Sequence, residues 1–336
     1  MNNTDRLHIF RSLIASYLDG TSFEPHVDID ISFLNRHKLI PILNYIVESQ
    51  NIHNLLGHKD YELISTYCEY TERKLIIFEN EMRKISKELE KLNITHVYRK
   101  GLSLSRLYKK KSHRIFNDID ILINKSESEV VTTLLASLGY CSGYYHHATR
   151  LIKPHRKETI IKYRMSPDHH LPLVKIVDGI PVVIDIAFNL EWASKSQLQD
   201  IKEVLNNKQV FDNFNFMNPE FNYIHTIYHL LRECFFQSAL KTRPPYLSSF
   251  LDVYLMSKID CDPHYLPQED NHYFSKIESL TRGLLDSSVT YEQLNNSNKM
   301  LIRNNEFLNT NIGLLDFIFT ERYKYNSLLG SLTFYH

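Results

Sequence analysis

The sequence has little cysteine and glycine, no excess of charge of either sign and no long apolar run. Its four cysteines lie far apart and form no Cys-x-x-Cys pair, which argues against a zinc knuckle and against a disulfide framework. Lysine plus arginine and aspartate plus glutamate both number 39, so the net charge is zero. Net charge therefore indicates neither a nucleic-acid nor a membrane partner, although local patches stay open.

No apolar run approaches the roughly 18 residues that a membrane span needs. The polar start, Met1 to Arg6, leads into an amphipathic segment, so we see no signal peptide and expect a reducing cytoplasm. We attribute the scarcity of glycine to genome composition. The 336 residues are enough for about two domains, or for one large domain with an extension.

Hydrophobic periodicity divides the chain into three regions. Residues 1–92 and 194–336 show the three- and four-residue apolar spacing of helices, whereas 93–193 mixes strand and helix patterns. We therefore expect an α+β fold in which a small mixed β-sheet is flanked by N- and C-terminal helical regions. The stretch from Asp260 to Asn271 is the best candidate for an irregular loop.

The middle region carries several strand signals. Asp178-Gly179 between two β-branched runs predicts a hairpin, in which Pro181 must lie at a strand start or at an edge. A helix is expected over 127–138, stopped by Gly139. The strand-like pieces expected before the hairpin are 94–98, 144–152, 158–163 and 171–177.

Two aspartates, Asp118 and Asp120, stand two residues apart in the β-branched run that ends at Ile123. Side chains alternate along a strand, so both carboxylates point to one face while the isoleucines between and after them point to the other. Adjacent like charges are costly unless a cation holds them. Because Mg²⁺ is commonly shared between carboxylates and substrate phosphates, the pair predicts metal-dependent phosphate chemistry.

A third acid, Asp185, is a lone charge in the apolar run that follows the expected hairpin. An unpaired buried charge is expensive, so this carboxylate is expected to face a partner. If both strands belong to one sheet, Asp185 completes a three-carboxylate site with Asp118 and Asp120.

The order of these motifs resembles a known family. The segments YRKGLSLSRLY, RIFNDIDILI, LLASLGY and VVIDIAFNL are similar to the uncharacterised nucleotidyltransferase family of the polymerase-β-type superfamily. In that family a Lys-Gly turn, an Arg before an Asp-h-Asp strand, a helix ending in Leu-Gly-Tyr and a later acidic strand follow one another. The weaker resemblance of NRHKLIPILNYIV, HTIYHLL and FLDVYLM extends it over most of the first 260 residues.

The resemblance implies a reaction and a metal site. Asp118 and Asp120 would bind two Mg²⁺ ions, with Mn²⁺ as the alternative, and Asp185 would bind one and help to activate the acceptor. The acceptor would attack the α-phosphate of an NTP such as ATP in line, and pyrophosphate would leave. The acceptor itself, whether small molecule, peptide or protein, is left open.

The resemblance also implies how the NTP is held. Lys100, Ser103 and Arg114 would contact its phosphates as a point charge, a hydroxyl donor and a planar fork. Gly101 would let the backbone approach the triphosphate closely, since no Cβ is in the way.

Two positions depart from the family pattern. Relatives commonly carry Asp-h-His-Trp-Arg at the third acid, whereas Asp185 is followed here by Ile, Ala187, Phe and Asn189. The lost His and Arg leave the acceptor open. They also motivate an alternative, in which the chain is a catalytically weak nucleotide-binding scaffold or partner protein.

Other interpretations of these residues compete. An Asp-x-Asp pair also serves sugar-nucleotide glycosyltransferases, but those need a parallel sheet ahead of the motif, where this sequence has helices. His225 and His229 lie four apart on an expected helix but lack the Glu of a metalloprotease, so we favour structural roles for them. For His169-His170, just before the Asp185 strand, a substrate-facing role stays open.

One basic cluster has two interpretations. It would either guide triphosphate or an anionic acceptor toward the carboxylates, or be a solvated hairpin face. Its members are Lys153, Arg156, Lys157, Lys162 and Arg164.

Overall fold

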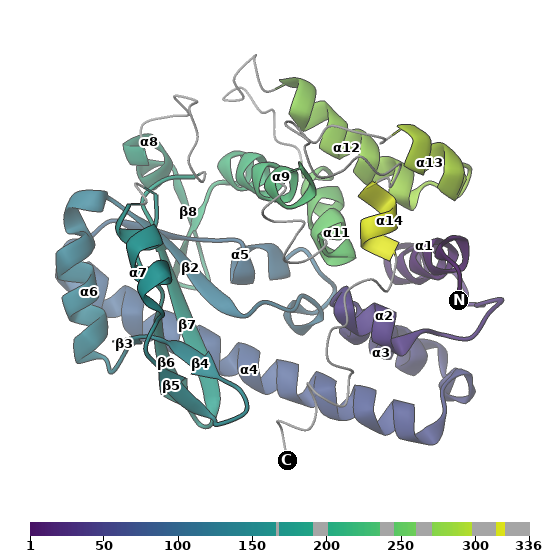
Figure 1. The fold of residues 1–336 in the computed structure, drawn as a ribbon, viewed down its shortest axis with the longest axis horizontal. Helices are drawn as coiled ribbons and strands as arrows, with labels where there is room; N and C mark the ends of the chain where they lie inside the picture. The colour runs from purple at the N-terminus through teal and green to yellow at the C-terminus, as the bar shows by residue number, and fades with distance from the viewer. Residues whose placement is uncertain (166–167, 191–200, 236–244, 260–270, 298–313, 320–336) are drawn as a thin grey trace. The chain divides into compact units, whose positions relative to one another are not determined.

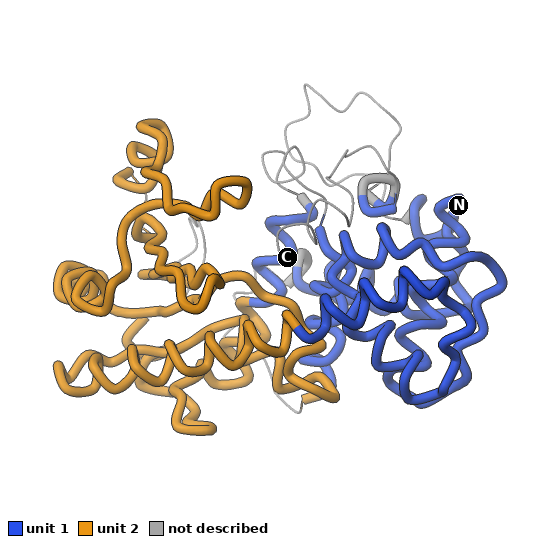
Figure 2. The backbone as a smooth tube through the Cα atoms, turned by 90° about the horizontal axis from the view of Figure 1, so that it is seen from below, with its two compact units in different colours: residues 1–69, 226–258, 268–336 blue, residues 70–225, 259–267 orange. Residues whose placement is uncertain are grey.

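The computed structural model describes residues 1–165, 168–190, 201–235, 245–259, 271–297 and 314–319. The expected loop from Asp260 to Asn271 lies outside these residues, except for its last position. The backbone divides into two compact units (Figure 2). Unit 1 comprises Met1–Glu69, Thr226–Lys258 and Gln268–His336, and unit 2 comprises Tyr70–His225 and Ile259–Pro267.

Among its described residues, unit 1 contains helices and loops but no strand. Two of the boundaries between the units fall within α4 (His58–Lys91) and α9 (Pro219–Phe235). No helix in the described part of the chain is long and apolar enough to cross a membrane. The other helices of unit 1 are α1 (Asn3–Asp19), α2 (Ile31–Arg36), α3 (Ile40–Gln50), η1 (His53–Leu55), α11 (Leu247–Met256), α12 (Asn271–Leu285), α13 (Tyr291–Ser297) and α14 (Leu314–Phe319).

Helix α1 follows directly from its sequence. The Asn2 side chain and Asp5 form a capping box at its start, and Gly20 ends it in the left-handed conformation with φ 72°. The apolar stripe with helical spacing is buried, as the periodicity predicts, and its members are Leu7, Phe10, Leu13, Ile14 and Tyr17.

Unit 2 is built on a mixed sheet. Its described strands are β1 (His96–Arg99), β2 (Asp118–Ile123), β3 (Cys141–Ser142), β6 (Leu173–Val177), β7 (Ile180–Ala187), β8 (Lys208–Phe211) and β9 (Phe214–Met217). They lie in the order β3-β6-β7-β2-β1-β9-β8 (Figure 1). Strand β7 runs parallel to β2, and β9 parallel to β1, whereas the other neighbours are antiparallel.

Shorter elements complete unit 2. A separate two-stranded sheet pairs β4 (Tyr144–His146) with β5 (Leu151–Lys153). The remaining described helices are α5 (Gly101–Ser105), η2 (Lys111–His113), η3 (Lys125–Glu127), α6 (Ser128–Ser137), α7 (Lys157–Arg164) and α8 (Ile201–Asn206).

The two faces of the sheet differ. Ile119, Ile121 and Ile123 of β2 face a large core that includes residues of α4 and α6. On the other face, Leu122 and Ala187 belong to a smaller core with residues of α8 and α9. The aspartates of β2 share the second face, because side chains alternate along a strand. The fold is α+β, with a mixed sheet and helical regions, as the sequence predicts.

The predicted β6–β7 hairpin is confirmed. Asp178 and Gly179 both have positive φ, at 49° and 79°, and Val177 pairs with Ile180. Pro181 pairs with β6 only, since β7 begins to pair with β2 at Val183. Its missing N–H therefore costs no hydrogen bond to β2.

Two local expectations were wrong. The piece 158–163, expected as a strand, lies in helix α7. The hairpin β8–β9 occupies residues 208–217, within a region expected to be helical. Its turn is Asp212-Asn213, with φ 51° and 64° at the two residues.

Candidate active site

The site lies on the second face of the sheet, where two parallel strands each present an aspartate. Asp120 of β2 is directly opposite Asp185 of β7, while Asp118 pairs with Val183 two residues earlier. One ligating oxygen from each of Asp118, Asp120 and Asp185 lies within 4.8 Å of the others. Among the described residues, these three aspartates form a group that is placed to hold a metal ion.

A buried arginine extends the same row of side chains. Arg99 of β1 pairs with Asp120, so Arg99, Asp120 and Asp185 stand side by side across three strands. The guanidinium Nη2 lies 3.8 Å from Asp120 Oδ1, and Nη1 donates a hydrogen bond to the carbonyl oxygen of Asn189 at 3.1 Å. Arg99 is 2% exposed, and its Nε and Nη2 have no hydrogen-bond partner among the described residues. The sequence reasoning assigned it no role.

The turn after β1 brings in a second cation. Lys100 Nζ lies 3.6 Å from Asp120 Oδ1. The backbone of Lys100 has φ 49° and ψ −126°, an unusual conformation for a residue with a side chain. Such strain costs on the order of 1–3 kcal/mol and gathers at functional sites.

Gly101 is required by the same turn. Its φ is 22°, and a Cβ at this position would lie 3.3 Å from Cδ2 of Phe116. Any other residue would therefore have to displace the Phe116 ring. Gly101 begins α5, so Lys100 stands immediately before a helix and beside the acids.

Burial and mutual repulsion perturb the central acid. Burial raises the pKa of Asp120 to about 6. The charge of Lys100 acts against this rise, whereas the charge of Asp118 adds to it. With Arg99 and Lys100 as counter-charges, three ionised carboxylates still carry one excess negative charge. The hard oxygen donors and this excess charge fit a divalent cation such as Mg²⁺.

His169 holds the third acid. Its Nδ1 donates a hydrogen bond to Asp185 Oδ1 at 3.1 Å. Burial opposes the ionisation of Asp185, but the hydrogen bond from His169 and the charges of His169, Arg99 and Lys100 together outweigh burial and lower the pKa of Asp185. Burial also lowers the pKa of His169, so the neutral imidazole is favoured. The arrangement points the His169 ring at Asp185.

The two residues that depart from the family pattern, Ala187 and Asn189, contact other residues near the site. Ala187 is fully buried in the smaller core and pairs with His169 across an isolated bridge. Besides accepting from Arg99, Asn189 donates from its side-chain Nδ2 to Asp168 Oδ1 at 3.4 Å. Both positions therefore support the segment that carries His169.

Two predicted phosphate contacts have other partners in the structure. Ser103, buried in α5, accepts a hydrogen bond on Oγ from Asn222 Nδ2 at 2.9 Å. Arg114 Nη1 donates a hydrogen bond to the carbonyl oxygen of Gly101 at 3.2 Å, so Arg114 stabilises the Lys100-Gly101 turn.

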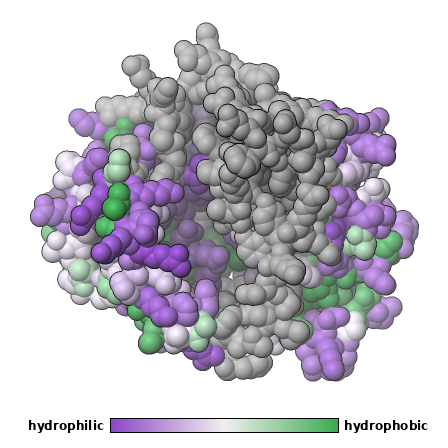
Figure 3. Space-filling view, viewed as in Figure 1, coloured by the Kyte–Doolittle hydropathy of each residue, from purple (hydrophilic) through white to green (hydrophobic). Residues whose placement is uncertain are grey.

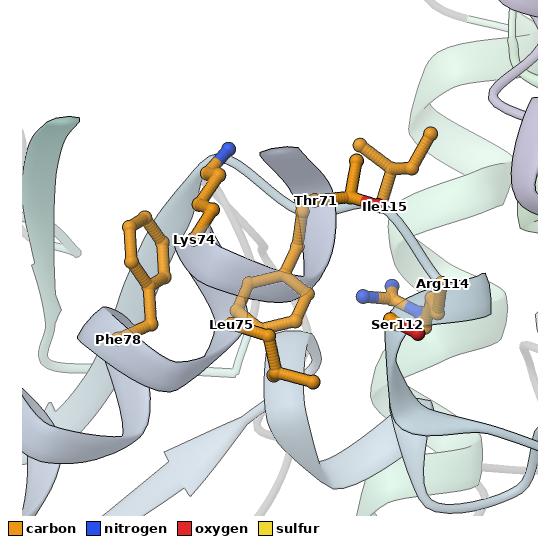
Figure 4. Close-up of a pocket in the computed structure, with 8 residues that line it drawn as sticks. Thr71, Lys74, Leu75, Phe78, Ser112, Arg114 and Ile115 are labelled. Carbon is orange, nitrogen blue, oxygen red and sulfur yellow. The ribbon is translucent and has the colours of Figure 1, made fainter. Parts of the chain in front are cut away.

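Arg114 also lines a small pocket between α4 and the segment 112–116 (Figure 4). Lys74, Leu75 and Phe78 of α4 form its other side. The pocket encloses about 20 Å³, room for about one water molecule, so it does not hold a nucleotide.

The histidine pair on α9 has ordinary partners. His225 Nδ1 donates to the carbonyl oxygen of Leu190 at 2.6 Å, and His229 Nε2 lies 3.6 Å from Glu233 Oε1. The group of possible metal ligands found among the described residues includes neither histidine.

Fold and site together define an α+β protein whose parallel strands present a three-carboxylate candidate metal site. The model of the uncharacterised nucleotidyltransferase family matches residues 29–270, which is more than half of the chain. The chain therefore belongs to that family, as the resemblance implied, and nucleotidyl transfer is the general activity that this membership supports. Comparison with curated proteins finds no match.

Proposed function

We propose that this protein is a Mg²⁺-dependent nucleotidyltransferase that moves an NMP from an NTP such as ATP to an acceptor. The observation that carries the proposal is the register of β2 and β7. It sets Asp120 against Asp185 and brings three carboxylates within 4.8 Å of one another. Such a cluster is costly without a cation, and membership of the nucleotidyltransferase family supplies the chemistry.

The proposed transfer is an in-line displacement. An acceptor oxygen attacks the α-phosphorus and forms a new P–O bond. The bond from that phosphorus to the oxygen bridging the β-phosphate breaks, and pyrophosphate leaves with its electron pair. The acceptor proton passes to the Asp185 carboxylate and from there to solvent. The lowered pKa of Asp185 keeps it ionised at neutral pH, as an acceptor of that proton must be.

Asp118, Asp120 and Asp185 would hold the cations, with Mn²⁺ as the alternative to Mg²⁺. Bound cations would neutralise the phosphate oxygens and orient the reacting groups. Lys100 would receive the triphosphate as a point charge beside Asp120, and Gly101 would let the backbone approach it. Ser103 and Arg114 would contribute further phosphate contacts, as the family resemblance implies.

Release of pyrophosphate tests the proposal. Wild-type protein with Mg²⁺, NTP and a cell lysate as the source of acceptor should release pyrophosphate and place label from [α-³²P]NTP on an acceptor. The rate of the variant Asp118→Asn/Asp120→Asn should fall at least a thousandfold. The two asparagine side chains are uncharged, so they no longer neutralise the charge of a divalent cation.

The matched control is Asp60→Asn/Asp178→Asn, which removes two exposed aspartates outside the site. Its rate should equal that of the wild type. Equal loss in both double variants would contradict the assignment of the site. Metal-independent NTP binding without turnover would instead favour the scaffold alternative. The acceptor class would be read from where the label ends: small molecule, peptide or protein, or nucleic acid.

We further propose a cytoplasmic location. The cysteines in the described residues, Cys68, Cys141 and Cys234, form no disulfide bond, and a reducing compartment keeps cysteines in this state.

A further inference from the structure

One short part of unit 2 carries a concentrated positive charge. Residues 144–165, which we call the hairpin–helix module, contain β4, β5 and α7. Glu158 is the one acid of this segment. Its six basic residues are Arg150, Lys153, Arg156, Lys157, Lys162 and Arg164. Because the whole chain is neutral, the module is positive against a remainder that is net negative.

These charges face solvent. Arg156, Lys157 and Arg164 are exposed, as are Arg150 and Lys162. Large apolar side chains are exposed among them: Leu151 is 60% exposed, Ile161 57% and Met165 79%. Figure 3, in the same view as Figure 1, shows hydrophobic side chains set among hydrophilic ones on the side of the molecule where α7 lies. A face that is both basic and apolar fits a partner with phosphates and flat apolar groups.

Aromatic rings stand along the same module. Tyr144 lies against His146 and His155, at ring-centroid distances of 6.4 Å and 6.2 Å. Tyr145 makes an edge contact with His147 at 5.0 Å. Tyr144 is 38% exposed. Basic residues interleaved with exposed aromatic rings are the pattern with which proteins bind single-stranded nucleic acid, where bases stack and phosphates are neutralised.

The module is anchored beside the acids. His155 Nε2 donates a hydrogen bond to the carbonyl oxygen of Pro172 at 3.2 Å. Pro172 directly precedes Leu173, which pairs with Ile184, the neighbour of Asp185. From strand spacing and chain geometry, His155 lies on the order of 10–15 Å from Asp185. The basic helix α7 begins two residues after His155, so it starts close to the site.

We propose that the hairpin–helix module docks a single-stranded nucleic acid and leads its hydroxyl end to the carboxylates. The inference rests on the proposed function, since the docked strand is the acceptor. An NTP alone does not account for the module: Lys157 to Arg164 spans about 10 Å along α7, longer than a triphosphate. In the proposed function, Lys100, which lies 3.6 Å from Asp120 Oδ1, already receives the triphosphate.

Binding measured without NTP tests the docking step. A fluorescein-labelled single-stranded RNA of twelve nucleotides, and a DNA of the same sequence, are titrated with the full-length protein over a range of salt concentrations. The wild type should bind, and the affinity should fall as salt rises. In Arg156→Gln/Lys157→Gln/Arg164→Gln, Kd at low salt should rise at least tenfold. The salt slope should fall by about 2, which is about 0.7 for each lost phosphate contact.

The matched control removes three exposed lysines outside the module, as Lys59→Gln/Lys87→Gln/Lys208→Gln. Its Kd should stay within twofold of the wild type. Thermal melting of both triple variants checks that they fold. Equal weakening in the two triple variants, or no binding of either oligonucleotide at low salt, would overturn the inference. Binding to phosphatidylglycerol vesicles but not to the oligonucleotides would also overturn it, in favour of a membrane surface.

A second readout separates this inference from the proposed function. With Mg²⁺ and labelled NTP, the module variant should raise KM for the oligonucleotide while kcat is unchanged. Asp118→Asn/Asp120→Asn should still bind the oligonucleotide but transfer no label. If the strand binds through the module and pyrophosphate is released without label on the strand, the acceptor role is overturned. If no NTP turns over at all, the proposed function fails while the docking result stands.

Discussion

At the scale of single residues, the buried Arg99 is the main addition to the site. Its Nε and Nη2 are buried and have no hydrogen-bond partner among the described residues, and Nη2 lies 3.8 Å from Asp120 Oδ1. Its positive charge lies beside Asp120. This charge repels a divalent cation that binds the same carboxylate. We therefore regard Arg99 as a positioning residue that compensates the acids when no cation is bound.

This account predicts opposite effects of Arg99→Met with and without a divalent cation. In EDTA the variant should lose about 3 kcal/mol in unfolding free energy, because buried acids lose their partner. With Mn²⁺ the loss should shrink, since the cation no longer competes with a positive charge. Urea unfolding in both conditions measures the difference.

The control for Arg99 is Arg6→Met. Arg6 is also buried and pairs with Asp30 at 2.9 Å in unit 1. The free energy of unfolding that Arg6→Met loses should be the same with and without Mn²⁺. If Arg99→Met behaved like this control, Arg99 would have only a structural role.

The acids were visible in the sequence, and Arg99 was not. Asp118 and Asp120 stand out because charges are costly in a β-branched run. Arg99 matters because it pairs with Asp120 across strands, and that register is a tertiary fact. Its one local signal was a charged residue at the end of the strand Val97-Tyr98, just before Lys100.

At the scale of elements, α4 holds the sheet through a buried carboxylate as well as through apolar packing. Glu81 of α4 is 1% exposed. Its Oε2 accepts hydrogen bonds from Lys175 of β6 at 2.9 Å and from the Tyr140 hydroxyl at 3.0 Å, and Oε1 accepts from Lys84 at 2.6 Å. Helix α4, strand β6 and the segment after α6 therefore meet at one charge.

The Glu81 cluster predicts a pH dependence of stability. Burial alone would raise the pKa of Glu81, but its three hydrogen-bond donors outweigh it and hold that pKa below the ordinary 4.5. A depressed carboxyl pKa stabilises the fold above the unfolded value, and this contribution is lost as pH falls through the folded value. At pH 7, Glu81→Gln should cost about 2 kcal/mol in unfolding free energy.

Urea unfolding of the wild type and Glu81→Gln at pH 7 and pH 4 checks this. The difference between the two proteins should be smaller at pH 4, where Glu81 begins to be protonated in the unfolded state. The exposed Glu62→Gln serves as the control and should change little at either pH. A difference that grew on acidification would contradict the account of Glu81.

Long elements were predictable, and short ones between them were not. The apolar stripe of α1 and the Asp178-Gly179 turn carry strong local signals. Helix α7 does not, because Thr159, Ile160 and Ile161 are β-branched and no residue of the helix is buried. Because neither face of α7 packs in a core, its apolar residues do not show the helical spacing. The β8–β9 turn, Asp212-Asn213, did carry a hairpin signal, but within a region of helical periodicity.

At the scale of the whole molecule, chain order and spatial grouping differ. Unit 1 draws on three separate segments, and His37 connects them. Its Nδ1 accepts from the backbone N–H of Leu247, and its Nε2 donates to the carbonyl oxygen of Ile318 at 3.0 Å. Burial lowers the pKa of His37 to about 3, so it stays neutral in this role. The division into regions 1–92, 93–193 and 194–336 stays a prediction.

The global charge balance was also a poor guide to surface chemistry. A net charge of zero conceals a module with six basic residues and one acid, next to a site with an excess of negative charge. The hydrogen bond from His155 to Pro172 places the two close together, and no local pattern predicts that contact.

The central claim is that Asp118, Asp120 and Asp185 jointly hold a divalent cation for nucleotidyl transfer. Its most direct test is anomalous diffraction from crystals soaked in Mn²⁺ with a non-hydrolysable NTP. We expect an anomalous peak about 2.1–2.2 Å from carboxylate oxygens of these residues, with the triphosphate beside Lys100. A fully occupied nucleotide with no anomalous peak at the three acids, or with Mn²⁺ bound elsewhere, would contradict the account.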